Sequence, residues 1–381
     1  NKSMAKILRK LKIPAIGGGA RGRNPDYFIV VIAAAIVLFG LAMLSSASSD
    51  LGKIRFGDTY YYLKHQVAYG FSIGAAGFVF GAAIYYRRWQ KLAAILLAVN
   101  VVFLLAIFLG FGFKAGGAER WLKIGPFLFQ PSEMLKLTFM FYLAAWLAAS
   151  AKRTKSFWEG FLPLIVLAGA IALLLIFQPS TSTVVIILFS GAIVYFLSGA
   201  KLRYIAGLFL LGTAGFLSLI FISPYRFERM TAFMNPAADV QGAGYHINQA
   251  LIAVGSGGLW GTGYGQSTSK FSYLPEPIGD SIFVVIAEEL GFIGAAVFTA
   301  AFFFLVFRGF LVAWRCREQF GRLLAAGIVS VIAIQTVIHI GANIGILPLT
   351  GVPLPLVSYG GTSLAVFMTA LGILVNISKY S

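Results

Sequence analysis

Apolar runs long enough to cross a lipid bilayer recur along the whole sequence, and no other feature restricts the fold as strongly. We expect ten of them, at residues 27–48, 66–86, 92–112, 134–150, 161–177, 183–200, 204–224, 281–307, 323–345 and 362–378. Backbone amides inside hydrocarbon must find their hydrogen bonds within the protein, so these runs are predicted to be helices and not strands. The predicted fold class is therefore an all-α polytopic integral membrane protein.

The distribution of charge predicts how these helices are oriented. Only 11% of the residues are charged, against about 25% in soluble domains, yet the formal net charge is +17. Lysine and arginine concentrate in residues 1–26 and in the loop after every second run, whereas the alternate loops are nearly neutral. The positive-inside rule then predicts that both termini are cytoplasmic, and the charge needs no nucleic-acid partner to explain it.

The domain organisation follows from the same pattern. Residues 1–26 are interpreted as a basic cytoplasmic tail without a cleavable signal sequence, and residues 27–381 as a single membrane domain. Residues 225–280 form the one long outer loop, and loops of this length are usually functional or disordered.

Two outer segments carry most of the outer polar residues. Residues 113–133 place Glu119, Arg120 and Lys123 around Trp121, which fits either an interfacial anchor with solvated charges or a rigid pocket for a charged headgroup. Amphipathic pieces separated by a glycine-rich run in the long outer loop predict short interfacial or re-entrant helices, and the run itself has two interpretations. Its backbone amides could bind phosphate, or its glycines could simply permit tight turns.

Four charged residues lie close to or inside the predicted spans. Asp280 stands at the outer edge of the eighth run, either as a helix N-cap or as a carboxylate whose partial burial raises its pKa towards that of a general base. Glu288 and Glu289 lie about two turns deeper, where acids usually need a partner. Lys136 in the fourth run is the candidate cation, so Lys136 and Glu288 are predicted to form a structural polar pair.

The sequence gives little support to a dedicated metal site or to nucleotide chemistry. No two histidines stand at the spacing of metal ligands, which argues against zinc, while a loosely held Mg²⁺ on outer carboxylates stays open. The single cysteine, Cys316, cannot form a disulfide within the chain. There is no Walker motif.

Four motifs, in order along the chain, resemble a known family. They are AERWLKIGPFLFQPSEMLKL (118–137), QALIAVGSGGLWGTGYGQS (249–267), YLPEPIGDSIFVVIAEELGFIG (273–294) and GILPLTGVPLPLVSYGGTSL (345–364). Together with ten spans they resemble the SEDS family, the FtsW, RodA and SpoVE polymerases of the bacterial cell wall. Residues 45–48 and 265–277 look more like FtsW than like RodA.

This resemblance implies a peptidoglycan glycosyltransferase that polymerises lipid II at the outer leaflet of the bacterial cytoplasmic membrane during cell division. Asp280 matches the essential aspartate of the family and would take the proton from the acceptor sugar's 4-hydroxyl, which attacks the donor's anomeric carbon as undecaprenyl pyrophosphate leaves. The substrate-binding candidates are Glu119, Arg120, Lys123, Lys270, Glu276 and Ser358. A loosely bound divalent cation, Mg²⁺ or Mn²⁺, is also expected, with Asp280 as a candidate ligand.

The resemblance also implies partners. The family normally works with a class B penicillin-binding protein that crosslinks the glycan, and other membrane proteins of the division machinery are expected as well. Two departures from the family pattern stand out. Ser180 follows Gln178 and Pro179 where an aspartate is usual, and Ile278-Gly279 replaces the His-Thr that often precedes the aspartate.

Three alternatives stay open at this point: a RodA-like elongation polymerase, a lipid II flippase or other transporter, and a scaffold that only docks partners. A transporter should place ionisable or broken-helix sites near the membrane midplane, often in repeated halves. Only Glu288 and Glu289 lie at depth, and no internal repeat is evident. The outer position of the polar residues favours an enzyme.

Overall fold

The computed structural model describes residues 24–381 except 116–117, 126, 236–241, 243 and 272. Most of the predicted basic tail, residues 1–23, therefore lies outside the described residues.

Helices occupy all ten predicted spans in the described part of the chain. They are α2 (Tyr27–Ala47), α4 (Tyr61–His65) continued by η1 (Gln66–Phe71) and α5 (Ser72–Ala83), α6 (Arg87–Ala106) continued by η2 (Ile107–Phe111), α7 (Pro131–Ala148), η3 (Phe157–Phe161) continued by α9 (Leu162–Phe177), α10 (Thr181–Leu197), α11 (Leu202–Ile222), α14 (Ile282–Arg315), α15 (Gln319–Asn343) and α16 (Gly361–Ser378). Eight of these are long and apolar enough to cross a membrane. The other two helices are shorter or less apolar. Helix α10 has 17 residues, and the first turns of α7 carry the charged side chains of Glu133 and Lys136. The prediction of an all-α polytopic membrane protein is confirmed.

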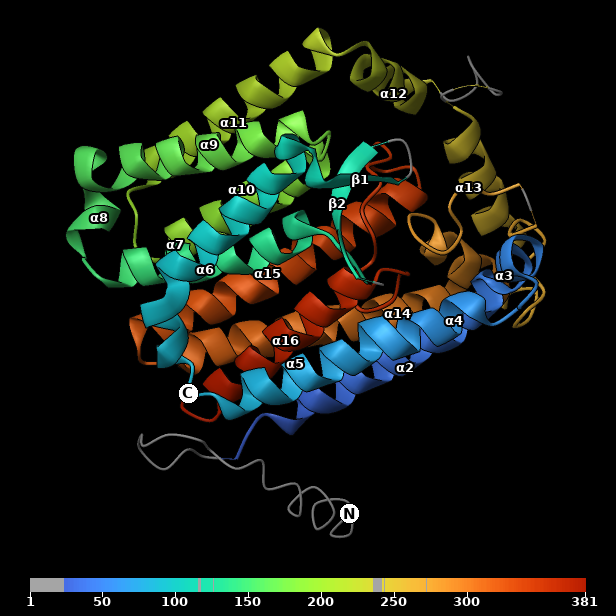
Figure 1. The fold of residues 1–381 in the computed structure, drawn as a ribbon, viewed down its shortest axis with the longest axis horizontal. Helices are drawn as coiled ribbons and strands as arrows, with labels where there is room; N and C mark the ends of the chain where they lie inside the picture. The colour runs from blue at the N-terminus through green and yellow to red at the C-terminus, as the bar shows by residue number, and fades with distance from the viewer. Residues whose placement is uncertain (1–23, 116–117, 126, 236–241, 243, 272) are drawn as a thin grey trace.

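Shorter elements connect these spans outside the bundle. They are α3 (Ser49–Phe56), α8 (Lys152–Lys155), α12 (Pro224–Met234) and α13 (Tyr245–Ser256). The last two belong to the long outer loop, as the prediction of short helices there required. Figure 1 shows α12 and α13 at the same end of the molecule as α3.

A small sheet replaces the loop that we expected between the third and fourth spans. The strands β1 (Gly112–Ala115), β2 (Ala118–Ile124) and β3 (Phe127–Phe129) form an antiparallel sheet in that order. Gly125, with φ +60°, turns the chain between β2 and β3. The strands satisfy one another's backbone groups, so this connection is stiffer than a loop.

Among the eight candidate membrane spans, the last two are the most buried and α11 is the least buried. The apolar windows of α15 and α16 are 72% and 67% buried, whereas that of α11 is only 6% buried. Figure 1 shows α11 on the outside of the bundle. Its exposed apolar side chains, including Phe209, Leu210 and Phe221, suit a helix that faces lipid.

Helix α14 is interrupted after two and a half turns. Gly291 has φ +67° and ψ −170°, which is not helical, so the segment before it and the segment after it point along different axes. A Cβ atom at Gly291 would lie 2.3 Å from the backbone nitrogen of Gly261. The glycine therefore permits both the bend and the close approach of the loop before α14.

The two described ends of the chain meet at the end of the bundle opposite α12 and α13 (Figure 1). The backbone amide of Asp26 donates a hydrogen bond to the hydroxyl of Ser378, and the Asp26 carboxylate pairs with Arg308. Both described ends therefore share one face, which agrees with the expectation that the termini lie on the same side.

Close packing of α5 on α16 generates a stability prediction. A Cβ atom at Gly81 would lie 2.8 Å from the carbonyl oxygen of Thr369 and 2.9 Å from Cγ1 of Ile373. Gly81→Leu should therefore push the two helices apart and lower the free energy of unfolding by about 1–3 kcal/mol. The matched control is Gly212→Ala in α11, which has no atom within 4 Å of its Cβ position. Thermal unfolding in detergent measures both, and equal stability of the two variants would contradict the prediction.

Candidate functional site

Asp280 lies in the turn immediately before α14, at the end of the bundle that also carries α12 and α13. The N-cap residue of α14 is Ser281, and Asp280 forms no capping hydrogen bond there. The hydroxyl of Ser281 donates to the carbonyl oxygen of Pro275 at 2.9 Å. The interpretation of Asp280 as a helix cap is therefore wrong, and its carboxylate has another role.

The backbone around Asp280 is held by two neighbouring elements. The amide nitrogen Nδ2 of Asn343, in α15, donates to the carbonyl oxygen of Asp280 at 2.9 Å. The hydroxyl of Ser358 donates to the carbonyl oxygen of Gly279 at 2.7 Å and accepts from the amide of Leu354 at 2.7 Å. Ser358 is 3% exposed. It was predicted to bind substrate, but its hydroxyl is used to fix the turn that carries Asp280.

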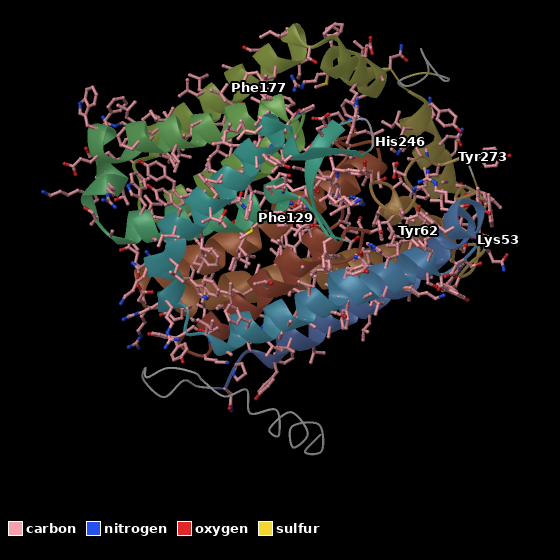
Figure 2. The ribbon with its side chains drawn as sticks, viewed as in Figure 1. Lys53, Tyr62, Phe129, Phe177, His246 and Tyr273 are labelled. Carbon is pink, nitrogen blue, oxygen red and sulfur yellow. The ribbon has the colours of Figure 1, made fainter. Side chains whose placement is uncertain are left out.

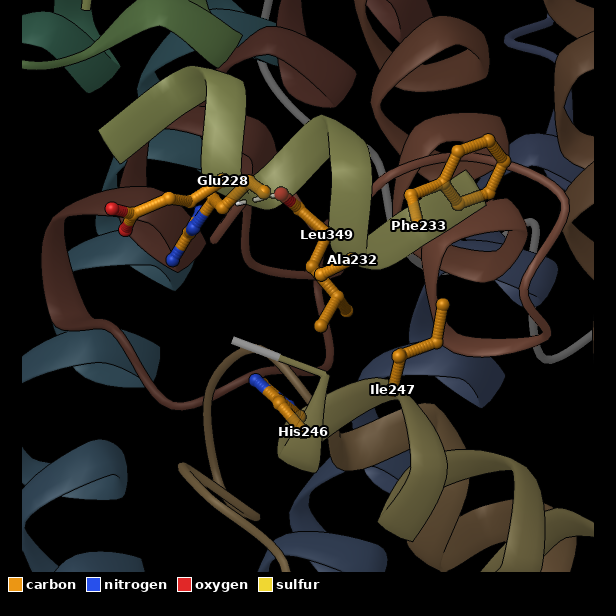
Figure 3. A pocket seen from close by; sticks show the side chains of 7 residues that line it. Glu228, Ala232, Phe233, His246, Ile247 and Leu349 are labelled. Atoms are coloured by element: carbon orange, nitrogen blue, oxygen red, sulfur yellow. Dashed lines mark hydrogen bonds between the residues drawn. The ribbon is translucent and has the colours of Figure 1, made fainter. Parts of the chain in front are cut away.

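Two cavities that share three lining residues lie at this end of the bundle, and the smaller one is lined by Asp280. The larger, of about 180 Å³, lies between α12 and α13 and is lined by Glu228, Arg229, Ala232, Phe233, His246, Ile247 and Leu349. Figure 3 shows Ala232 and Phe233 on one wall and His246 and Ile247 on the other. The smaller, of about 30 Å³, shares Arg229, His246 and Leu349 with it and is also lined by Asp280. Figure 2 places His246 at the end of the bundle near Tyr273.

The surroundings of Asp280 raise the pKa of its carboxyl to about 6. Burial is the main cause, since it disfavours the charged form, and the neighbouring carboxylate of Glu276 adds to it. Arg229 and Arg120 act in the opposite direction by favouring the carboxylate. Asp280 is thus ionised in most molecules at neutral pH, yet basic enough to accept a proton.

Glu276 acts on Asp280 from an exposed turn. Its backbone has φ +47°, which is uncommon for a residue other than glycine, and its carbonyl oxygen accepts from the amides of Gly279 at 3.1 Å and Ser281 at 3.2 Å. The carboxylate of Glu276 lies close enough to Asp280 to raise the pKa of its carboxyl group.

His246 is a neutral donor in this site. Its Nε2 lies 2.7 Å from the hydroxyl oxygen of Ser281. That hydroxyl already gives its hydrogen to Pro275, so Nε2 must carry the hydrogen of the shared bond. Burial, together with the charge of Arg229, lowers the pKa of His246 to about 4, which keeps the ring uncharged at neutral pH.

The three charged residues predicted on residues 113–133 do not converge. Side chains alternate along β2, so Glu119 and Lys123 share one face and are exposed, while Arg120 points the other way. Arg120 donates to the carbonyl oxygens of Gln178 at 3.1 Å and Pro179 at 2.6 Å. Of these three residues, only Arg120 changes the pKa of Asp280, which it lowers.

Lys270 was also predicted to contact substrate, and this is wrong. Its side chain is 3% exposed, and its ammonium donates to Glu289 Oε1 at 3.0 Å, to Ser46 Oγ at 3.0 Å and to the carbonyl oxygen of Gly265 at 2.8 Å. All three of its hydrogens are therefore satisfied inside the protein.

The predicted pair of Lys136 with Glu288 is wrong as well. Lys136 finds a partner one turn away on its own helix, Glu133 at 2.8 Å, and a second in Gln335 at 2.6 Å. Glu288 accepts instead from the hydroxyl of Ser267 at 2.6 Å and the amide of Thr268 at 2.9 Å. Backbone amides of the preceding loop satisfy this acid without a cation.

These contacts form a unit that we call the clamp: residues 257–270 together with Ser46, Glu288 and Glu289. The amides of Thr262 and Gly263 donate to the carbonyl oxygens of Glu288 and Glu289, both at 3.0 Å. A Cβ atom at Gly261, which has φ +82°, would lie 2.2 Å from the carbonyl oxygen of Glu289. The glycines thus allow close approach of two backbones, and those two amides are not available to a phosphate.

Ser180, which stands where the resembled family usually has an aspartate, is bonded within its own helix start. Ser180 is 9% exposed and precedes α10, where its hydroxyl shares a hydrogen bond of 2.9 Å with Thr183. The position carries no charge, and its polar atom is satisfied by the helix that follows.

Arg229 is a site residue that the sequence analysis missed. It lies on α12, which is amphipathic because it covers the outer end of the bundle, and it donates to the carbonyl oxygen of Leu349 at 3.2 Å. A signal existed: residues 224–234 place two arginines three positions apart, on one side of a short helix. The prediction of a helix there was too general to single them out.

The buried ion pair of the clamp generates a second stability prediction. Lys270→Met leaves the Glu289 carboxylate buried without its cation, so it should lower the free energy of unfolding by about 3–5 kcal/mol. Lys270→Met combined with Glu289→Leu removes both charges and should recover much of that loss. Thermal unfolding in detergent measures the two variants, and a double variant less stable than Lys270→Met would contradict this account.

Comparison with known proteins places this geometry in a family. The family model for FtsW, RodA and SpoVE, described as "Cell cycle protein", matches residues 26–381. Stage V sporulation protein E of Bacillus subtilis is 37% identical over 359 residues, which cover 94% of this chain and 98% of that protein. A probable peptidoglycan glycosyltransferase FtsW of Geobacter metallireducens is 37% identical over 354 residues, which cover 93% of this chain and 94% of that protein.

Solved structures agree with these relatives. A chain of "Structural coordination of polymerization and crosslinking by a peptidoglycan synthase complex" superimposes with a TM-score of 0.78 at 28% identity, covering 93% of this chain and 97% of that one. Rod shape determining protein RodA of Thermus thermophilus gives a TM-score of 0.68 at 27% identity, covering 94% and 98%. The chain therefore belongs to the FtsW/RodA/SpoVE family.

Proposed function

We propose that this protein is a peptidoglycan glycosyltransferase that polymerises lipid II, with Asp280 as its general base. The observation that carries the proposal is a carboxylate with a raised pKa that lines a cavity and lies close to two arginines. Relatives named as probable peptidoglycan glycosyltransferases, 35% and 37% identical over most of the chain, support this class of reaction. The relatives named FtsW support an FtsW-like role in cell division over a RodA-like role in elongation.

The proposed reaction begins with proton transfer at Asp280. The 4-hydroxyl of the acceptor sugar gives its proton to the Asp280 carboxylate while its oxygen forms a bond to the anomeric carbon of the donor. The bond from that carbon to the pyrophosphate oxygen breaks, and undecaprenyl pyrophosphate leaves with the bonding electron pair. Asp280 then releases the proton to solvent before the next cycle.

Positive charge near the base suits the leaving group. A pyrophosphate that departs as an anion is stabilised by cations held in place beforehand, because they need not reorganise during the reaction. Arg120 and Arg229 both act electrostatically on Asp280, so they lie where this charge would develop. Lys123 and Glu119 lie exposed on β2 and would contact substrate only at the rim.

The residues around Asp280 do not fit a resident metal ion. The described part of the chain contains no cluster of three histidine, cysteine, aspartate or glutamate side chains that could hold one. Two arginines also act on the single carboxylate in the smaller cavity. We therefore propose that any divalent cation, Mg²⁺ or Mn²⁺, would be carried by the oxygens of the substrate's pyrophosphate and not by Asp280.

The location and partners are part of the same proposal. The protein is a multi-pass membrane protein, and we place it in the bacterial cytoplasmic membrane with both termini cytoplasmic and Asp280 at the outer leaflet. The solved structure of a peptidoglycan synthase complex supports a class B penicillin-binding protein as partner, with other division membrane proteins beside it. A flippase is less well supported, because Lys136 and Glu288 have partners within the protein.

The central prediction concerns Asp280→Asn. An amide cannot accept the proton, so reconstituted protein with its transpeptidase partner should lose nearly all polymerisation of purified lipid II, about 10²-fold or more. The control is Glu159→Gln, an exposed acid at the start of η3, which should keep full activity. Glycan strands of normal length and yield from Asp280→Asn would refute the assignment, and lipid II that crosses vesicles without being polymerised would support a flippase.

The pKa of Asp280 predicts the acidic limb of the pH profile. With a pKa of about 6 the base is about nine tenths ionised at pH 7 and about one tenth ionised at pH 5. The rate of polymerisation should therefore fall roughly tenfold as the pH falls through that range. A rate that stays constant between pH 5 and pH 7 would contradict the role of Asp280 as a base.

Two neutralising variants should move this limb in opposite directions. Arg229→Gln removes a charge that favours the carboxylate, so the limb should move to higher pH. Glu276→Gln removes a charge that disfavours it, so the limb should move to lower pH. Initial rates of polymerisation measured from about pH 4.5 to about pH 8 give both shifts, because this range includes the ordinary pKa values of histidine and lies close to those of carboxyl groups. Shifts of the same sign would contradict the electrostatic account.

A further inference from the structure

The smaller cavity beside Asp280 contains two buried polar atoms that the reaction described above does not use. His339 and Asn343, from the last two turns of α15, line it together with Asp280. Both side chains are 1% exposed. Nε2 of His339 and Oδ1 of Asn343 have no hydrogen-bond partner among the residues that the structure describes. Buried polar atoms of this kind are costly unless something satisfies them.

Both of these atoms are acceptors. Nδ1 of His339 lies 2.7 Å from the carbonyl oxygen of Val352, and a carbonyl can only accept, so Nδ1 carries the hydrogen of the neutral ring. Nε2 is then left with a lone pair. Nδ2 of Asn343 donates to the carbonyl oxygens of Asp280 and His339, at 2.9 Å and 2.8 Å, so its Oδ1 is also an acceptor. The ionised carboxylate of Asp280 is a third acceptor in the same cavity.

Size and polarity together define the ligand that would satisfy this cavity. Its volume is about 30 Å³, and about 10–15 Å³ is enough for one water molecule that has two to four polar partners. A group that meets three acceptors must itself donate hydrogens. Arg229, His246 and Thr350 also line the cavity and carry donors, but none of them bonds Nε2 of His339 or Oδ1 of Asn343. A single water molecule fits the volume and supplies two hydrogens, which satisfy two of the three acceptors at a time.

We propose that one water molecule in this cavity donates hydrogen bonds to Nε2 of His339 and to the Asp280 carboxylate, and that His339 thereby orients the general base. His339 is a positioning residue in this scheme, because it acts through the water and not on the substrate. The inference rests on the proposed function, in which Asp280 accepts the proton of the attacking hydroxyl.

The backbone of a second lining residue also lies close to the carboxylate. A Cβ atom at Gly351, which has φ +64°, would lie 3.2 Å from Oδ2 of Asp280. Val352, whose carbonyl accepts from His339, is the next residue. The same loop therefore fixes the tautomer of His339 and lies against the carboxylate that the water would orient.

A water fits the charges better than a metal ion does. The cavity offers one carboxylate with two neutral ligands, and the charges of Arg229 and Arg120 reach that carboxylate. A divalent cation held by protein alone usually has more anionic oxygen than this. The metal ion is the competing occupant, and the experiment below separates the two.

Two substitutions at His339 each keep one of its two polar contacts and remove the other. Asparagine reaches about as far as Nδ1, so His339→Asn keeps a donor to the Val352 carbonyl but lacks the acceptor at Nε2. Glutamine reaches about as far as Nε2, so His339→Gln keeps a polar group on the cavity but lacks the bond to Val352. A purely structural role for His339 would make His339→Gln the more harmful change. Positioning through the water would make His339→Asn the more harmful change.

The expected result is a loss in kcat without a matching change in KM. His339→Asn should lower kcat for lipid II polymerisation about tenfold, whereas His339→Gln should stay within about threefold of the unaltered protein. The acidic limb of kcat should move to higher pH in His339→Asn, because the carboxylate loses a donor that favours its charged form. The titratable or charged groups that face Asp280 in this comparison are Glu276, Arg120 on β2, Arg229 on α12, His246 on α13 and His339 on α15.

Thermal unfolding of both variants in detergent is measured beside the kinetics, so that a loss of stability can be told apart from a loss of activity. If His339→Gln loses as much activity as His339→Asn, or more, or if the pH limb does not move, the inference is overturned. Binding of Mn²⁺ alone, followed by its electron paramagnetic resonance signal, tests the competing occupant. A site present in the unaltered protein and lost in His339→Asn would replace the water by a metal ion.

The same set of measurements keeps this inference apart from the proposed function. If unaltered protein does not polymerise lipid II, or if Asp280→Asn does so normally, the proposed function fails. If those two behave as expected while His339→Asn matches the unaltered protein, the role of His339 alone fails.

Discussion

Two adjacent carboxylates in the first turns of α14, Glu288 and Glu289, fasten the preceding loop to that helix. Acids at this depth are unfavourable without partners. Glu288 accepts from the hydroxyl of Ser267 and the amide of Thr268. Oε1 of Glu289 binds Lys270, while its Oε2 has no hydrogen-bond partner among the described residues. The chain between this loop and α14 carries Asp280, so the position of the proposed base depends on charges whose partners lie within the protein.

The site itself combines low polarity with a few opposed charges. Burial and Glu276 raise the pKa of Asp280, while Arg120 and Arg229 limit that rise. The arginines come from two different elements, Arg120 from β2 and Arg229 from α12. Such a balance can hold the pKa of a carboxyl group at about 6 without a metal ion, and it places two cations beside that carboxyl group.

The sequence predicted the helical spans because apolar length, which is local information, determines them. The position of Asp280 at the edge of one span left a helix cap and a base both open, and the family resemblance favoured the base. The partner of Lys136, Glu133, lies one turn away on the same helix and could have been inferred locally. Lys270 and Glu289, in contrast, are joined only by the fold of the loop between them. Arg229 was missed because its importance comes from where α12 packs, and periodicity does not give that position.

The interruption at Gly291 is held on both sides by the clamp. Glu288 and Glu289, just before it, accept hydrogen bonds from residues 262–270, and the amides of Phe292 and Ile293, just after it, donate to the carbonyl oxygens of Gly258 and Leu259 at 2.9 Å and 3.2 Å. A continuous helix that changes its tilt with bilayer thickness carries its end along with it. In α14 the helix is instead fastened to the loop at the break itself. The segment that follows Asp280 is therefore tied to this loop as well as to the rest of the helix.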